Sequence, residues 1–319
     1  MAGRVDALFI FLLCLCGFTA IAIFIMIFVF AAKYRRSRHP VADQIEGSIP
    51  LELTWTGVPL LIFLGIFIWG AVLYFIERTP PDDSAEIYTV AKQWMWKFEH
   101  LEGQREINQL HVPIGRDVKM IMTSQDVIHS FFVPEFRIKQ DVLPGRYTVA
   151  WFRATKAGTY HLFCAEYCGT AHSGMIGDVV VMEPAAYEQW LSGSPSAPLT
   201  ETGKQLFLSL GCSTCHRFDV QGRGPNLIGV FGKPVLLEDG RTVTADENYV
   251  RESILAPAAK VVSGFKPIMP TFQGIVSEEQ LNALVAYIKS LSQPPQGTAG
   301  RQNTPATSSQ GGEKMMQVQ

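Results

Sequence analysis

Two long apolar stretches dominate the first quarter of the chain. Residues 7–32 and 53–76 carry no charged side chain, and each is long enough to cross the ~30 Å core of a bilayer as a helix. A cleavable signal peptide is the alternative for the first stretch, but its apolar core would be shorter and its basic cluster would come first. Pro59 is tolerable in the first turns of a membrane helix. The pattern predicts a transmembrane hairpin with helices at about 7–32 and 52–77.

The segment between the two apolar stretches is basic. It contains Lys33, Arg35, Arg36 and Arg38, and the positive-inside rule places such a loop in the cytoplasm. We therefore expect a multi-pass protein of a bacterial inner membrane. Its N-terminus and everything after residue 77 would lie on the periplasmic side.

Between residues 86 and 182 the pattern changes to short strand-like segments separated by Gly- and Pro-containing turns. Examples are residues 86–91, 118–123, 146–153, 158–163 and 179–182. Strands at this spacing are typical of a β-sandwich or barrel.

A third region follows a stretch with the composition of a linker. Residues 192–198 are Ser, Gly, Pro and Ala, which marks a boundary. Beyond it, 202–210 and 278–291 have apolar residues at helical spacing, and the Gly-, Ser-, Thr- and Gln-rich end is predicted to be disordered. We expect a hairpin (1–84), an all-β domain (85–191), a linker (192–199), an α-helical domain (200–293) and a tail (294–319).

Composition narrows the choice of chemistry. The 319 residues are enough for two domains. The net charge of -2 gives no indication of a basic surface that would bind nucleic acid. The six cysteines form three close pairs: 14 with 16, 164 with 168, and 212 with 215. Pairs so far from one another indicate local metal or cofactor chemistry rather than a disulfide framework.

The second cysteine pair belongs to a short segment rich in soft ligands. Cys164, Cys168, His172 and Met175 occur within twelve residues, a set that favours copper over hard cations. A disulfide and a zinc site of two Cys and two His are the alternatives, but zinc gives no reason for Met175. A single blue-copper site needs only one Cys, so two thiolates bridging two metals is the better hypothesis.

The third pair occurs as Cys212-Ser-Thr-Cys215-His216. This pattern is typical of covalent c-type haem attachment, with the histidine as an iron ligand. The same motif can also occur by chance in a redox or zinc protein. Met269 is the only methionine between the linker and the tail, which makes it the candidate for the second axial ligand, and His/Met ligation raises the haem potential.

The spacing Cys164-x3-Cys168-x3-His172-x2-Met175 closely resembles the CuA loop of cytochrome c oxidase subunit II. The segment from Asp126 to Pro134 resembles a second signature of that family. The resemblance implies a binuclear copper centre, and it implies the ligands His129, Cys164, Cys168, His172, Met175 and the backbone carbonyl of Glu166. It also implies that the Glu166 side chain helps to bind magnesium at the interface with subunit I.

Three other segments carry weaker resemblances. Gln93-Trp94-Met95-Trp96 resembles the family motif whose first tryptophan admits electrons, although two indoles on one strand face are by default core residues. Leu51–Thr56 resembles the segment in which a glutamate, here Glu52, admits protons to the K pathway; its alternative role is to complement a helix dipole. Residues 224–227 resemble the loop against the proximal histidine in class I cytochromes c.

Taken in order, the regions resemble subunit II of a caa3-type oxidase, in which a CuA domain is fused to a cytochrome c. The implied fold is a multidomain membrane protein with a two-helix hairpin, an all-β cupredoxin-like domain and an all-α class I cytochrome c domain. The implied function is electron entry into a haem-copper oxidase that reduces oxygen and pumps protons in a partner subunit. The chain itself would have no oxygen site.

The implied partners are subunit I, subunit III, the lipid bilayer and an external donor, which could be a cytochrome c, an iron–sulfur protein or another respiratory complex. A quinol oxidase subunit would lack the copper ligands. A CuA-bearing subunit of a nitric oxide reductase and a copper carrier or assembly protein are the alternatives. Glu52, Glu166 and the haem motif favour the oxidase.

Overall fold

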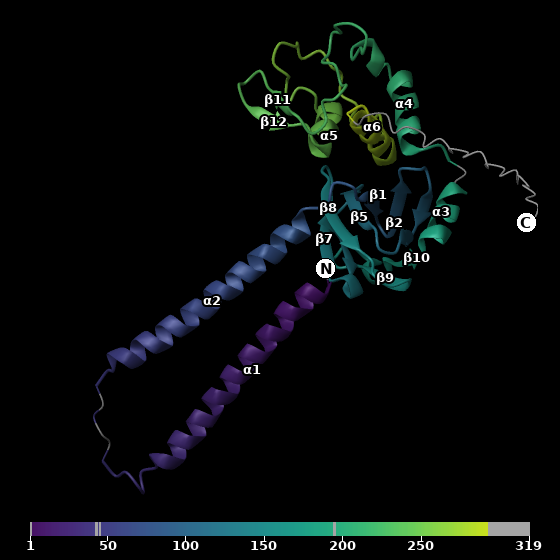
Figure 1. The fold of residues 1–319 in the computed structure, drawn as a ribbon. Coiled ribbons are helices and arrows are strands. Elements are labelled where there is room, and N and C mark those ends of the chain that lie inside the picture. Colours follow the sequence, from purple (N-terminus) through teal and green to yellow (C-terminus); the bar gives the residue numbers. More distant parts are fainter. Residues whose placement is uncertain (1, 42–43, 45, 194–195, 293–319) are drawn as a thin grey trace, which may run out of the picture.

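The computed structural model describes residues 2–41, 44, 46–193 and 196–292. It contains a helical hairpin, a β-sandwich and an α-helical domain in chain order (Figure 1). The predicted tail at 294–319 and residues 194 and 195 of the predicted linker lie outside the described residues.

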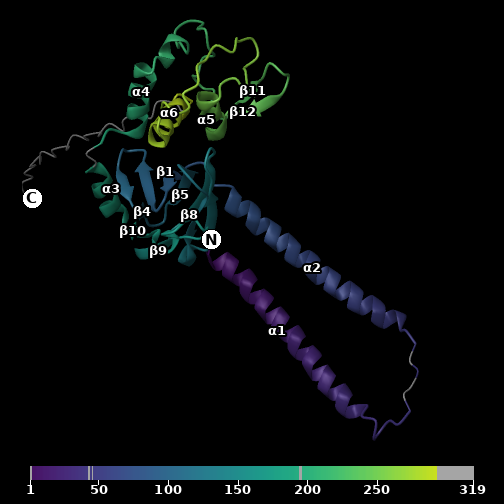
Figure 2. The same cartoon turned by 180° about the vertical axis from the view of Figure 1, so that it is seen from behind.

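The hairpin consists of α1 (Ala2–Lys33) and α2 (Ile49–Arg78). Both helices are long and apolar enough to span a membrane, and their large apolar side chains are exposed, as expected for surfaces that lipid would cover. Arg137 forms an ion pair with Asp6 at 2.8 Å, and Trp151 Nε1 donates to the carbonyl of Ile76 at 3.0 Å. The start of α1 and the end of α2 therefore adjoin the sandwich, and the connecting loop lies at the far end (Figures 1 and 2).

Two five-stranded sheets form the sandwich. One has the order β3-β2-β1-β5-β8 and the other β4-β10-β9-β6-β7. The strands are β1 (Ala85–Lys92), β2 (Met95–His100), β3 (Arg105–Ile107), β4 (Gln109–Pro113), β5 (Asp117–Ser124), β6 (His129–Val133), β7 (Ile138–Val142), β8 (Thr148–Arg153), β9 (Gly158–Cys164) and β10 (Ile176–Met182). Side chains alternate between the faces of each strand, and the inward set, including Trp96, Phe98, Phe131 and Leu162, is fully buried. The predicted all-β sandwich is confirmed.

Helix α3 (Pro184–Ser192) follows the sandwich, and the α-helical domain begins with α4 (Leu199–Ser209). This domain also contains α5 (Glu247–Leu255), α6 (Glu278–Ser290) and a small hairpin of β11 (Pro234–Leu236) and β12 (Thr242–Thr244). A capping box of Ser277 and Gln280 starts α6. Gly203 allows α4 and α6 to cross closely, because a Cβ at that position would lie 2.0 Å from the carbonyl oxygen of Ala283.

The α-helical domain packs on the outer face of the first sheet. Figures 1 and 2 both show α5 and α6 next to β1, β5 and β8 of this sheet. Tyr88, Ile121 and Tyr147 of the sandwich belong to the same buried apolar cluster as residues of α4, α5 and α6. The two domains thus share one core.

Candidate metal centre and haem-binding segment

The copper-type loop is anchored between two strands of the second sheet. β6 begins at His129 and β9 ends at Cys164, and Cys164 pairs with Phe131 across the sheet. The amide of Cys164 donates to the carbonyl of Met175, just before β10, at 3.2 Å, and the amide of Ala165 donates to the carbonyl of Ser130 in β6 at 3.0 Å. This pairing explains how His129, far away in sequence, reaches the cysteine loop.

The structure brings all six predicted copper ligands together. Cys168 Sγ lies 3.8 Å from Cys164 Sγ and from Met175 Sδ, and 3.4 Å from His172 Nδ1. Cys164 Sγ lies 3.9 Å from His129 Nδ1 and 3.3 Å from the carbonyl oxygen of Glu166. A disulfide would need sulfur atoms about 2.05 Å apart, so the two thiols are free. Two thiolates, two imidazoles and a thioether at these separations fit copper better than a hard cation.

The electrostatics of the two thiols differ. Burial opposes ionisation of Cys164, but its contacts with His129 and nearby amides outweigh burial and lower the pKa of this thiol to about 6. Burial and the neighbouring Cys164 raise the pKa of Cys168 to about 12. One thiol therefore ionises readily by itself, whereas the second is expected to lose its proton only when a metal binds.

Asp126 orients the imidazole of His129. Its Oδ1 lies 2.8 Å from His129 Nε2, and its Oδ2 accepts a hydrogen bond from the amide of Gln93 at 2.8 Å. A carboxylate that accepts a hydrogen bond from one ring nitrogen of a histidine leaves the other ring nitrogen to bind a metal. Here Nδ1 faces the Cys164 sulfur.

The haem-type motif begins just after α4. Gly211 adopts a left-handed conformation (φ +75°) that turns the chain into Cys212–Thr214. His216 Nδ1 lies 2.8 Å from the carbonyl oxygen of Pro225, and a Cβ on Gly224 would lie 2.8 Å from His216 Cε1. The 224–227 loop therefore packs against the imidazole and holds its orientation, as expected for a metal ligand.

Two further haem candidates lie at the edge of the apolar core of the α-helical domain. Cys212 and Met269 are partly buried and pack against the cluster formed by α4, α5 and α6. Half-buried thiols, an oriented imidazole and a thioether around an apolar core fit a covalently attached haem.

Comparison with known proteins agrees with this geometry. Residues 103–183 match the family model for the periplasmic domain of cytochrome c oxidase subunit II, and residues 200–292 match that for cytochrome c. Cytochrome c oxidase subunit 2 of Alkalihalophilus pseudofirmus is 30% identical over 289 residues, which cover 85% of this chain and 82% of that protein. The chain belongs to the cytochrome c oxidase subunit II family.

Two further comparisons cover smaller shares of the chain. The alternative cytochrome c oxidase subunit 2 of Bradyrhizobium diazoefficiens is 30% identical over 54% of this chain and 73% of that protein. The solved periplasmic domain of subunit II of cytochrome oxidase from Bradyrhizobium japonicum is 27% identical, covers 36% of this chain and 96% of that chain, and has a TM-score of 0.35.

Family membership confirms several predictions. The chain is a membrane-anchored subunit II with a fused cytochrome c domain, and its function is electron entry into a haem-copper oxidase. The combination agrees with the caa3 type. Copper and haem c are the cofactors that these two domains indicate.

Trp94 lies beside the copper loop, but in a turn and not on a strand as expected. It belongs to the turn that precedes β2, whereas Trp96 lies within β2 and is fully buried, so the expectation of two indoles on one strand face is wrong. Trp94 Nε1 and Gln93 Nε2 donate to the Cys168 carbonyl at 3.3 and 2.7 Å. Gly169 allows this approach: its φ is +117°, and a Cβ there would lie 2.9 Å from Gln93 Nε2. The sequence interpretation missed Gln93 and Gly169 as parts of the site.

The two candidate acids lie far from each other. Glu52 is exposed in the first turn of α2. Figure 1 shows that α2 begins at the end of the hairpin away from the sandwich. Glu166 contributes its backbone carbonyl to the ligand cluster, and its side chain is exposed. The Glu166 carboxylate is thus free to contact a partner subunit.

Proposed function

We propose that this subunit relays electrons from an external donor through haem c to a binuclear CuA centre and then to subunit I. Cys212 and Cys215 would attach the haem covalently, with His216 and Met269 as axial ligands. His129, Cys164, Cys168, His172, Met175 and the Glu166 carbonyl would hold the copper pair. The bound metals supply the one-electron redox chemistry.

The single observation that carries the copper proposal is the convergence of these ligands. Two sulfur atoms 3.8 Å apart have an imidazole nitrogen within 4 Å on each side. β6, β9 and β10 hold the loop at both ends, and Asp126 orients His129. A site fixed in this way changes little in geometry when an electron arrives, which suits rapid transfer.

We further propose roles for the residues that adjoin this site. Trp94, bonded to the Cys168 carbonyl, is a candidate for electron entry into the copper loop. Glu166 is a candidate magnesium ligand at the interface with subunit I, and Glu52 a candidate for proton entry into that subunit. Slower proton uptake in Glu52→Gln at unchanged haem reduction would support the last role; unchanged uptake would exclude it.

Topology and partners complete the proposal. The basic loop after α1 would lie in the cytoplasm, which places both redox domains outside the inner membrane. Subunit III and a cytochrome c, iron–sulfur protein or other respiratory complex would be further partners. We also propose that the chain divides into a hairpin (1–84), a copper domain (85–191), a linker (192–199) and a cytochrome domain (200–293). Protease added outside spheroplasts should cleave the chain after residue 77, and cleavage there only after the membrane has been opened would contradict this orientation.

The decisive experiment measures copper and haem per chain in the purified oxidase complex. We expect two coppers with a delocalised mixed-valence signal and one haem c in the wild type. Cys168→Ser should lose the copper pair and keep the haem, because a serine hydroxyl does not supply a bridging thiolate. Cys14→Ser, a matched change at an exposed cysteine of α1, should alter neither. Zinc, a single copper, or a full copper pair in Cys168→Ser would overturn the assignment.

A further inference from the structure

One peptide group of the copper loop is bound by side chains from outside the loop. The carbonyl oxygen of Cys168 accepts a hydrogen bond from Gln93 Nε2 at 2.7 Å and a longer one from Trp94 Nε1 at 3.3 Å. No backbone amide of the residues that the structure describes donates to this carbonyl. The carboxamide of Gln93 is therefore the main partner of the peptide group that follows a copper-ligand candidate.

The loop leaves room for this contact at Gly169. A Cβ at this position would lie 2.9 Å from Gln93 Nε2 and 3.3 Å from Trp94 Cζ2, and the φ of +117° also favours glycine. A larger residue would push both donors away from the carbonyl. The close approach of Gln93 thus depends on the loop as well as on the turn.

The backbone of Gln93 is held on the other side of the site. Its amide donates to Asp126 Oδ2 at 2.8 Å, and Asp126 Oδ1 lies 2.8 Å from His129 Nε2. A hydrogen bond to a carboxylate is stronger than one between neutral groups. Gln93 therefore connects the carboxylate that orients one ligand with the peptide group of another.

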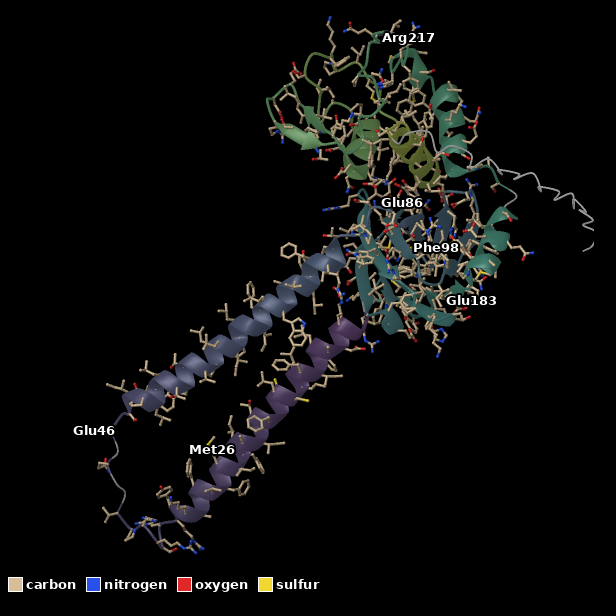
Figure 3. The ribbon with its side chains drawn as sticks, in the orientation of Figure 1. Met26, Glu46, Glu86, Phe98, Glu183 and Arg217 are labelled. Carbon is tan, nitrogen blue, oxygen red and sulfur yellow. The ribbon has the colours of Figure 1, made fainter. Side chains whose placement is uncertain are left out.

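The turn that carries Gln93 is short and firmly anchored. Gln93 and Trp94 lie between Lys92 of β1 and Met95 of β2, which pair with each other. Further along β2, Phe98 has no exposed area, and Figure 3 shows it among the side chains that fill the sandwich. A side chain on such a turn loses little additional freedom when it forms a hydrogen bond.

The electrostatic effect of the Gln93 carboxamide has a definite sign. Its N–H hydrogen carries partial positive charge and points at the peptide group of Cys168, whose Sγ lies 3.8 Å from both Cys164 Sγ and Met175 Sδ. A reduced centre holds one more electron than an oxidised one. Hydrogen-bond donors around a metal-bound cysteine therefore favour the reduced form and raise its potential.

We propose that Gln93 is a positioning residue whose carboxamide raises the reduction potential of the copper pair by donating to the Cys168 carbonyl. The inference rests on the proposed copper centre and adds a residue that binds no metal itself. A purely structural tie would hold the loop without favouring either redox state. The potential, measured at full copper content, separates the two roles.

The test is a redox titration of copper in the purified oxidase complex, at the potential where half of the wild-type copper is reduced. Gln93→Leu should lower the ratio of reduced to oxidised copper at least about threefold, because leucine donates no hydrogen bond. Gln93→Glu should lower it at least about tenfold at neutral pH, since an ionised carboxylate adds negative charge and cannot donate. Gln109→Leu, the same change at an exposed position of β4, should titrate as the wild type.

Protonation should restore the contact in the glutamate variant. A protonated carboxyl donates one hydrogen bond, so the potential of Gln93→Glu should rise towards the wild-type value between about pH 7 and pH 5. The potentials of the wild type and Gln93→Leu should change much less over the same range. A glutamate variant without this pH response would overturn the proposal.

Copper content decides how the leucine variant is interpreted. Two coppers with a wild-type or higher potential in Gln93→Leu would overturn the proposal. Should that protein lose copper, Gln93→Asn takes its place, because its amide is one methylene too short to reach the carbonyl; loss of copper there as well would show a structural tie only.

A readout without copper tests the contact itself. In the copper-depleted complex, iodoacetamide should alkylate Cys168 faster in Gln93→Leu than in Gln109→Leu, as located by peptide mass spectrometry. Equal rates would show that Gln93 does not hold the loop. A wild type without two coppers would instead refute the proposed centre, and the alkylation rates would still report on the contact.

Discussion

At the scale of single residues, the chemistry depends on which atoms are brought together. Cys164 and Cys168 have the same side chain, yet burial and neighbours separate the pKa values of their thiols, to about 6 and about 12. His216 is oriented by one backbone carbonyl, that of Pro225. Such contacts fix the tautomer of a histidine and ease the ionisation of Cys164, whereas Cys168 is expected to lose its proton only when a metal binds.

Met269 provides a direct test of the haem ligands. Replacing it by histidine should lower the haem potential by on the order of 100 mV, because imidazole stabilises ferric iron relative to the thioether. A redox titration of the haem in the purified complex measures the change. Met182→His, outside the cytochrome domain, is the control and should leave the haem potential unaltered. A Met269→His protein with the wild-type potential would show that another residue binds the iron.

At the scale of elements, the close crossing of helices α4 and α6 shapes the cytochrome domain. α4 and α6 meet where Gly203 faces the backbone of Ala283, and α4 then ends just before the haem motif. The crossing therefore positions Cys212 relative to the helix that also contacts the sandwich. Bulk at this point would disturb both the haem segment and the domain boundary.

Gly203→Ala should destabilise the cytochrome domain. Alanine favours helix by about 1 kcal/mol over glycine, but its Cβ would meet the Ala283 carbonyl at 2.0 Å. Overpacking of this kind costs about 1–3 kcal/mol or more, so the net effect is a loss. Thermal unfolding followed at the haem measures it. Gln205→Ala on the exposed face of α4 should have little effect, and a Gly203→Ala protein as stable as that control would contradict the close crossing.

At the scale of the whole molecule, an acid is enclosed where the two domains meet. Glu99 of β2 is 4% exposed and lies 3.0 Å from Arg105. The side-chain amide of Asn282, from α6, interacts with this carboxyl across the domain boundary. Burial raises the pKa of this carboxyl to about 7, although Arg105 opposes the shift.

This placement predicts how stability varies with pH. Because the folded-state pKa of Glu99 lies above its unfolded value, the folded protein binds more protons between about pH 4.5 and 7. Stability contributed by the protonated form is therefore present at low pH and lost as pH rises to about 7, by on the order of 3 kcal/mol.

Glu99→Gln should remove that dependence. Unfolding of the full chain at pH 5 and pH 8 should differ less in Glu99→Gln than in the wild type, with the variant the more stable at pH 8. Glu201→Gln, at an exposed position of α4, should retain the wild-type difference. An unchanged pH dependence in Glu99→Gln would show that Glu99 is ionised in the folded protein.

The local patterns of the sequence determined a large part of this protein. Charge-free stretches long enough to cross a bilayer as helices predicted the hairpin. Short segments separated by Gly- and Pro-containing turns predicted the strands, and the spacing of Cys164, Cys168, His172 and Met175 indicated the family. These features could be predicted because each depends on neighbours within a few residues. The same holds for the haem motif from Cys212 to His216.

Only the tertiary structure decided how distant segments meet. The pairing of β6 with β9 brings His129 to the cysteine loop, and the turn before β2 places Trp94 against Cys168. The boundary between the domains depends on residues up to about 200 positions apart, such as Glu86 and Lys289. No local pattern marks them, because an ion pair or a shared core is a property of packed surfaces, which exist only after each domain has folded.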